Sequence, residues 1–119
     1  MAVNGPVFRR QDEEGNWHYA FTAEDRHCNG NDVIHGGMLF SFADHFLGFS
    51  VAMAARRMST TISMNVNYVA PGKIGDFIEG EAKITRLTRT LAFAQAHVHV
   101  GPRALMTADG VFKLLGDGF

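Results

Sequence analysis

The sequence predicts a single α+β domain in which one long apolar helix is wrapped by an antiparallel β-sheet. Three observations carry this prediction. The chain has 119 residues, and single domains most often hold about 100–150. The segment 36–57 is rich in Ala, Leu, Met and Phe and lacks Pro, which is typical of a helix. Strand-like segments with short connections follow it, which favours antiparallel pairing. We therefore expect one domain over residues 1–119.

The first expected elements are a hairpin, a loop and the helix. Two short apolar and aromatic runs, 7–10 and 17–21, flank a polar turn, which predicts an opening hairpin. The helix would end with Arg56 and Arg57, which complement its dipole in the last turn. Phe42 and Phe46 follow helical spacing while Phe40 lies on another side, so we expect the helix to be buried nearly all round.

Four strands are expected after the helix, at 60–69, 77–87, 91–100 and 104–115. The first alternates strictly, so one of its faces is polar and either positions a water or substrate oxygen or is a solvated sheet face. Surplus apolar area in a domain of this size favours dimerisation through a sheet edge or the exposed side of the helix. The apolar residues of the 60–69 strand are Ile62, Met64, Val66 and Tyr68, and the polar ones are Thr61, Ser63, Asn65 and Asn67.

Composition excludes several classes of protein. A net charge of −1 offers no field for coating nucleic acid. The single Cys28 cannot form an internal disulfide or a Cys-rich zinc module. Residues 1–20 carry acidic residues where a signal peptide is apolar, and we expect no apolar segment of bilayer length, about 20 residues. The sequence thus predicts a cytoplasmic protein without nucleic-acid or membrane partners.

Two places in the sequence could take part in catalysis. His35, Gly36 and Gly37 stand where the loop meets the helix, and the first N–H groups of a helix lack internal acceptors. They could polarise a carbonyl, or the glycines could simply form a tight turn. Asp44 stands in mid-helix among phenylalanines, where an uncompensated buried carboxylate is costly. A role as general acid or base would explain its presence. It could also lie on a solvated side of the helix beside His45.

Other candidates are weaker. His97 and His99 share one strand face at a spacing able to bind metal, but no nearby Cys, Asp or Glu completes a set. We therefore expect a polar sheet face and no metal. His45 is interpreted as a packing or interface residue, and Cys28 receives no role. The basic residues in or near turns, Lys73, Arg86 and Arg89, could meet phosphates or lie on a solvated surface.

The helix-start residues and the turn after the first long strand together carry a resemblance to a known family. This combination resembles the PaaI-type acyl-CoA thioesterases of the hot-dog-fold superfamily, over roughly residues 27–115. The hot-dog fold is a long central helix wrapped by an antiparallel sheet, which agrees with the fold expected from periodicity. The residues are Asn29, His35, Gly36, Gly37 and Asp44, then Val69, Pro71, Gly75 and Asp76.

The resemblance implies catalytic roles. Gly36 would donate its backbone N–H to the thioester carbonyl, and Asp44 of the other protomer would act as nucleophile or general base. Asn29 would help to hold the substrate, His35 precedes the glycine pair, and Thr61 would orient the attacking water. The site would then lie across a homodimer interface, in an assembly that we expect to be a dimer of dimers.

The resemblance also implies binding residues. The CoA moiety would contact Gly37, Ser63, Tyr68, Ala70, Pro71, Gly72, Lys73, Arg86, Thr88, Arg89 and Thr90. Phe40, Phe46 and Phe49 could line an acyl pocket or belong to the core. Many relatives begin with a further helix that borders the acyl site, whereas here only a few residues precede the first strand, so we expect a more open pocket.

We therefore expect hydrolysis of an aromatic or a short- to medium-chain acyl-CoA, with CoA entering only as part of the substrate and no cofactor. Two alternatives stay open, a hydratase or dehydratase on the same fold and a non-catalytic acyl-CoA-binding domain.

Overall fold

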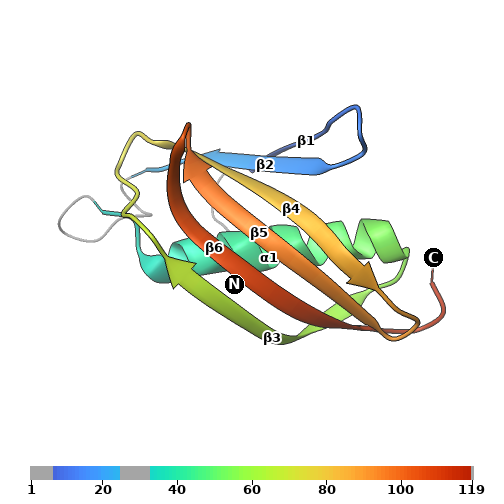
Figure 1. Cartoon of the computed structure of the whole chain (residues 1–119). Helices are drawn as coiled ribbons and strands as arrows, with labels where there is room; N and C mark the ends of the chain where they lie inside the picture. The colour runs from blue at the N-terminus through green and yellow to red at the C-terminus, as the bar shows by residue number, and fades with distance from the viewer. Residues whose placement is uncertain (1–6, 25–32, 119) are drawn as a thin grey trace.

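The computed structural model describes residues 7–24 and 33–118, and this part of the chain holds one helix and one six-stranded antiparallel sheet. The helix runs along one face of the sheet, which curves around it (Figure 1). This confirms the predicted α+β architecture. The elements are β1 (Phe8–Gln11), β2 (Trp17–Thr22), α1 (Gly36–Ala55), β3 (Ser59–Tyr68), β4 (Phe77–Leu87), β5 (Leu91–Val100) and β6 (Arg103–Leu114).

The strands follow the order β1-β2-β4-β5-β6-β3, so β3 lies at one edge of the sheet and β1 at the other. Each strand begins and ends within one residue of its predicted bounds. The register of β3 against β6 shifts between Thr61 and Ser63, a bulge that re-aims the side chains on either side of it. Ile62 and Tyr68, predicted for the apolar face of this strand, are each 55% exposed. At these two positions the apolar side of β3, an edge strand, is not buried within the single chain.

The core lies between α1 and the sheet. Phe42, Phe46 and Leu47 of the helix have no exposed surface. The strands beneath them present small residues, among them Gly80, which lies against the rings of Phe42 and Phe46, and Ala94. Small residues on the sheet give the helix's aromatic rings room to pack close to it.

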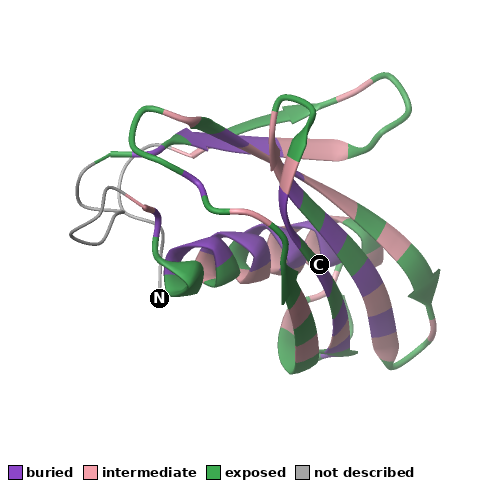
Figure 2. Cartoon of the chain, turned by 60° about the vertical axis from the view of Figure 1, so that its left-hand side comes forward, coloured by how far each residue is buried: buried purple, intermediate pink, exposed green. Residues whose placement is uncertain are grey.

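The helix differs from its prediction at its end and in its burial. It ends at Ala55, and Arg56 caps it in the left-handed conformation (φ 57°) with its N–H donated to the carbonyl of Ala52. The two arginines therefore follow the helix instead of lying in its last turn. The sheet covers only one side of the helix (Figure 2), so Phe40 is 37% exposed and His45 is exposed. The expected all-round burial is wrong for the single chain.

Length and composition alone would allow α1 to cross a membrane, because it has 20 residues and a mean hydropathy of 1.4 over its most apolar window. The expectation that no apolar segment approaches bilayer length is wrong in this respect. A core helix meets the same two criteria, and the fully buried residues of α1 face the sheet.

Candidate active site

The N-terminus of α1 has the geometry expected of a group of free N–H donors. His35 is the N-cap in an extended conformation, with φ −56° and ψ 134°. Its carbonyl accepts the N–H groups of Met38 at 2.9 Å and Leu39 at 3.2 Å. The N–H groups of Gly36 and Gly37 precede these and have no acceptor within the helix. Both glycines are exposed, so their N–H groups are accessible to a ligand.

The turn after β3 lies directly beside these donors. The Tyr68 hydroxyl donates to the carbonyl oxygen of Gly36 at 2.9 Å. The N–H of Ile34 donates to the Gly72 carbonyl at 2.8 Å, and a bridge joins Val33 to Lys73. The helix start and this turn border a hollow of about 360 Å³, lined by Val33, Ile34, Gly36, Leu39, Tyr68, Val69, Ala70 and Pro71.

Gly72 is needed for this close approach. A Cβ at its position would lie 2.5 Å from Cδ1 of Ile34 and 3.2 Å from Cδ1 of Leu105. Any larger residue would therefore push the turn away from the helix start. The structure thus places five predicted CoA-contact residues, Tyr68 to Lys73 apart from Val69, beside the N–H donors of Gly36 and Gly37.

Asp44 lies half-buried in the middle of α1, while Phe42 and Phe46 on either side of it are fully buried. The carboxylate therefore does not point into the core. The Thr61 hydroxyl donates to Asp44 Oδ1 at 3.0 Å. Thr61 is exposed, so this hydrogen bond leaves open both alternatives for the polar residues of β3, a solvated face and the positioning of a water or substrate oxygen.

Within one chain the N–H donor of Gly36 and the carboxylate of Asp44 are far apart. Asp44 stands eight positions after Gly36, which is about 12 Å along a helix axis at 1.5 Å per residue. A carbonyl polarised at Gly36 is therefore out of reach of the Asp44 carboxylate of the same chain. β3 links the two groups, since Thr61 lies near its start and Tyr68 ends it.

The residues expected to contact CoA in the turns lie in two groups. Lys73 lies at the helix start, but Arg86, Thr88, Arg89 and Thr90 lie at or near the β4–β5 turn, at the other end of the sheet. There the N–H of Leu114 donates to the Thr90 carbonyl at 2.9 Å, and Lys113, the residue before it, pairs with both Leu91 and Thr60. One chain does not bring the two groups together.

The three phenylalanines proposed for an acyl pocket differ in their surroundings. Phe46 is a core residue without exposed surface, stacked on Tyr19 with ring centroids 4.8 Å apart. Phe49 packs edge-on against Trp17 at 5.2 Å, with the Arg9 guanidinium carbon 4.3 Å from its ring centre. Phe40 is 37% exposed. Only Phe40 and Phe49 present surface to a ligand.

Some predicted residues stand apart from these contacts. Asn29 and Cys28 lie outside the described residues. Ser63 is exposed on β3. On the outer face of the sheet, Glu81 lies beside His97 and His99, so the expectation that no acidic residue completes that pair is wrong. The sequence alone did not indicate this contact, because Glu81 lies on a different strand from the two histidines.

Comparison with known proteins identifies the family of the chain. A family model described as the thioesterase superfamily matches residues 31–107. A Pseudomonas aeruginosa protein named as a candidate esterase is 32% identical over 112 residues, 92% of this chain and 84% of its own. Mouse acyl-coenzyme A thioesterase 13 is 32% identical over 88 residues, 73% of this chain and 63% of its own.

The fold is shared with solved structures. A crystal structure of a hypothetical thioesterase from Streptococcus pneumoniae with coenzyme A matches with a TM-score of 0.88 at 18% identity, covering 96% of this chain and 89% of that one. This likeness confirms the hot-dog fold. Because the sequence identity is low, the structural comparison supports only the assignment of the fold.

Proposed function

Because the chain belongs to the thioesterase superfamily, a group of thioester hydrolases, we propose that it hydrolyses an acyl-CoA to the free acid and CoA. Two relatives support CoA as the carrier, the mouse protein by its name and the pneumococcal structure by the coenzyme A in it. The acyl group proposed is aromatic or a short to medium aliphatic chain.

The proposed mechanism uses the backbone N–H of Gly36 and the carboxylate of Asp44. The Gly36 N–H donates to the thioester carbonyl oxygen and stabilises the negative charge that develops there. Asp44 takes a proton from water, which adds to the carbonyl carbon, or the carboxylate attacks that carbon itself. The C–S bond then breaks, and CoA leaves as a thiolate that takes up a proton. After direct attack by the carboxylate, water hydrolyses the resulting mixed anhydride, which gives the free acid and restores Asp44. Thr61 holds Asp44 in position through its 3.0 Å hydrogen bond.

The observation that carries this proposal is the separation of about 12 Å between Gly36 and Asp44 along α1. Two chains paired antiparallel along the free edge of β3 would set the Tyr68 end of one strand against the Thr61 end of the other. Gly36 of one protomer would then face Asp44 of its partner. We propose a homodimer with two such sites. A dimer of dimers would let the β4–β5 turn of another chain supply Arg86 and Arg89 to the CoA phosphates.

The proposed mechanism uses no metal and no organic cofactor, and CoA takes part only as a portion of the substrate. His35 and Gly37 complete the carbonyl-binding end of the site, and Asn29 is proposed to help hold the substrate. We place the reaction in the cytoplasm, since a chain with the single Cys28 gains no disulfide from an oxidising compartment.

The test is thiol release from phenylacetyl-, hydroxybenzoyl-, short-chain and long-chain acyl-CoAs, measured with a thiol reagent for the wild-type protein and for Asp44→Asn. The amide keeps an oxygen that can accept the Thr61 hydrogen bond, so the variant should fold and bind CoA. We expect it to lose about 10²- to 10⁴-fold in turnover. Unchanged turnover would remove Asp44 from the mechanism.

No release by a folded, dimeric wild-type protein would instead indicate an acyl-CoA-binding domain. A single turnover in ¹⁸O-labelled water separates the two roles of Asp44, because only direct attack by the carboxylate places the label in its side chain.

A further inference from the structure

The outer face of the sheet carries a group of histidines and carboxylates that the proposed mechanism does not use. Gly80 of β4 faces the helix rings, so its neighbours Glu79 and Glu81 point to the other side of the sheet. Val98 of β5 is fully buried toward the helix, so His97 and His99 also point outward. This face is separated from Asp44 by the whole thickness of the sheet.

Three of these side chains converge. One ligand atom each from Glu81, His97 and His99 lies within 4.8 Å of the other two. Glu81 stands opposite His97 in the β4–β5 register, and its Oε2 lies 2.6 Å from Nε2 of His99. The two imidazole rings stack with centroids 4.9 Å apart. The residues therefore meet through strand pairing.

His99 is oriented as a metal-binding histidine is. Its Nδ1 lies 2.8 Å from the carbonyl oxygen of Gly101, and a carbonyl accepts only, so Nδ1 carries the proton and donates it. That hydrogen bond turns Nε2 toward Glu81. Histidine ligands usually donate their second N–H to a carbonyl or carboxylate in this way, which fixes the ring. The His99 side chain is only 13% exposed, so its orientation is also held by packing.

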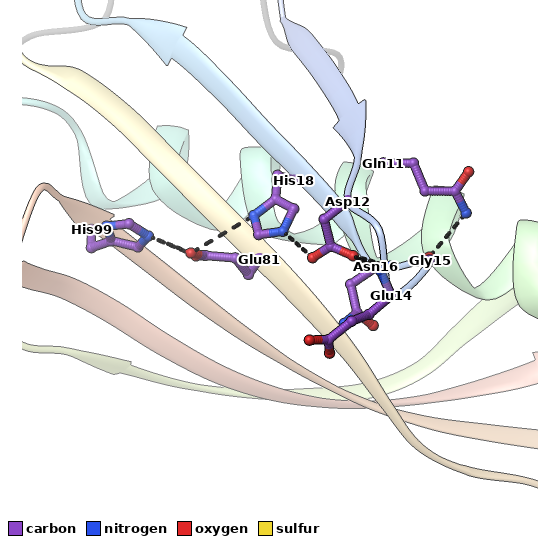
Figure 3. Close-up of polar contacts among 8 residues, drawn as sticks. All are labelled: Gln11, Asp12, Glu14, Gly15, Asn16, His18, Glu81 and His99. Carbon is purple, nitrogen blue, oxygen red and sulfur yellow. Dashed lines mark hydrogen bonds and ion pairs between the residues drawn. The ribbon is translucent and has the colours of Figure 1, made fainter.

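The glutamate has a supporting neighbour of its own. Glu81 Oε1 lies 4.0 Å from Nδ1 of His18, and Nε2 of His18 lies 2.7 Å from Oδ2 of Asp12 in the β1–β2 turn (Figure 3). The hydrogen bond from His18 lowers the pKa of Asp12, which keeps that carboxylate charged. The polar chain Asp12–His18–Glu81–His99 thus spans three strands and the hairpin.

We propose that Glu81, His97 and His99 bind one divalent transition-metal ion of the Zn²⁺ class. Two imidazoles and a carboxylate are a three-ligand set that Zn²⁺ accepts, with water in the fourth position. Glu81 and His97 border an open groove of about 730 Å³, which gives the ion and its water access. The ion takes the place between Nε2 of His99 and Glu81, and the ligand atoms move to about 3.3 Å apart, the spacing of a tetrahedral site.

The test is calorimetric titration of the chelator-treated, dialysed protein with ZnCl₂, with the absorption of bound Co²⁺ as a second readout. We expect one saturable site per chain in the wild type and equally in Asp44→Asn, because the proposed hydrolysis and this site are independent.

Variants define the site. Glu81→Gln and His97→Ala should each weaken binding about ten-fold or more, and Zn²⁺ should raise the unfolding temperature of the wild type but not of these variants. His45→Ala, which removes an exposed histidine on the far side of the molecule, is the matched control and should bind like the wild type. The proposal is overturned by the absence of saturable binding, or by binding that His45→Ala weakens as much as His97→Ala does.

Discussion

Tyr19 is the clearest case of a single residue whose ionisation is coupled to folding. Its side chain is 2% exposed, its ring stacks on Phe46, and its hydroxyl is hydrogen-bonded to the Ser50 hydroxyl. Burial disfavours the charged phenolate and raises the pKa of Tyr19 to about 12. The folded chain therefore holds this proton more tightly than the unfolded chain does.

We predict that this group makes stability fall in alkali. Below the ordinary pKa of tyrosine, about 10, the phenol is neutral in both states and contributes no pH dependence. As the pH rises from there through the folded-state pKa of about 12, the unfolded chain loses a proton that the folded chain keeps, so the free energy of unfolding falls. The loss is on the order of 2 kcal/mol once complete.

Urea denaturation of the wild type and Tyr19→Phe at pH 8 and pH 11 measures this effect. At pH 8 the variant should be less stable by about 1 kcal/mol, because the Ser50 hydroxyl loses its partner. At pH 11 the gap should close or reverse, because phenylalanine has no proton to lose. A gap that stays constant over this range would contradict the assignment.

Asp44 and Thr61 illustrate what residue identity can and cannot predict. A carboxylate among phenylalanines in a helix is costly, so Asp44 was a candidate from the sequence. Thr61 became a candidate only through the family resemblance, as a residue that would orient the attacking water, and nothing in the local sequence couples position 44 to position 61. The 3.0 Å hydrogen bond supplies that coupling. It also removes Asp44 from the core, where the neighbouring rings lie.

At the scale of elements, Gly80 lets β4 approach the aromatic rings of α1 closely. A Cβ at Gly80 would overlap the ring of Phe46 and lie 3.1 Å from Cε2 of Phe42, and both rings are fully buried. We predict that Gly80→Ala lowers the free energy of unfolding by about 1–3 kcal/mol, the cost of overpacking a core, as measured by urea denaturation.

The control is Gly48→Ala. A Cβ there meets no described atom within 4 Å, and alanine is the better helix former by about 1 kcal/mol. This variant should be as stable as the wild type or more so. Equal losses in the two variants would contradict the assignment of the Gly80→Ala loss to contact with the rings of Phe42 and Phe46.

The bounds of the strands were predictable because they depend on local features, alternation of apolar residues and the turns between them. The covered face of α1 was not, because its apolar residues surround the axis and the sequence does not say which side the sheet takes. Contacts between strands were equally hidden. Tyr68 with Gly36, and Glu81 with His99, depend on topology and register, which no spacing in the sequence reveals.

At the scale of the whole molecule, the chain contains both the Gly36 N–H and the Asp44 carboxylate needed for the proposed hydrolysis, but they are far apart within one chain. The edge strand β3 connects them and has no strand paired on its other side within the described part of the chain. Exposed apolar side chains extend along it, including Ile62, Tyr68 and Val69 at 55%, 55% and 59%. An uncovered apolar edge of this kind favours pairing with a second copy.

A mixing experiment tests whether one site draws on two chains. Gly36→Pro removes the proposed N–H donor at the first helical position, where proline is tolerated, and His35 already has the extended conformation that precedes a proline. Gly36→Ala is the matched control, since it keeps the N–H and its Cβ would lie 3.4 Å from the Tyr68 ring, an ordinary contact. We expect Gly36→Ala to keep most turnover and Gly36→Pro to lose about 10²- to 10³-fold.

Gly36→Pro and Asp44→Asn, each nearly inactive alone, are then unfolded together in equal amounts and refolded. Half of the dimers should be mixed, and each mixed dimer has one site with an intact glycine from one chain and an intact aspartate from the other. Thiol release should therefore recover to roughly a quarter of the wild-type value. A mixture no more active than its components, with mixed dimers demonstrated by mass spectrometry, would place Gly36 and Asp44 in the same half of the dimer. The separation along α1 would then have to be bridged by the substrate.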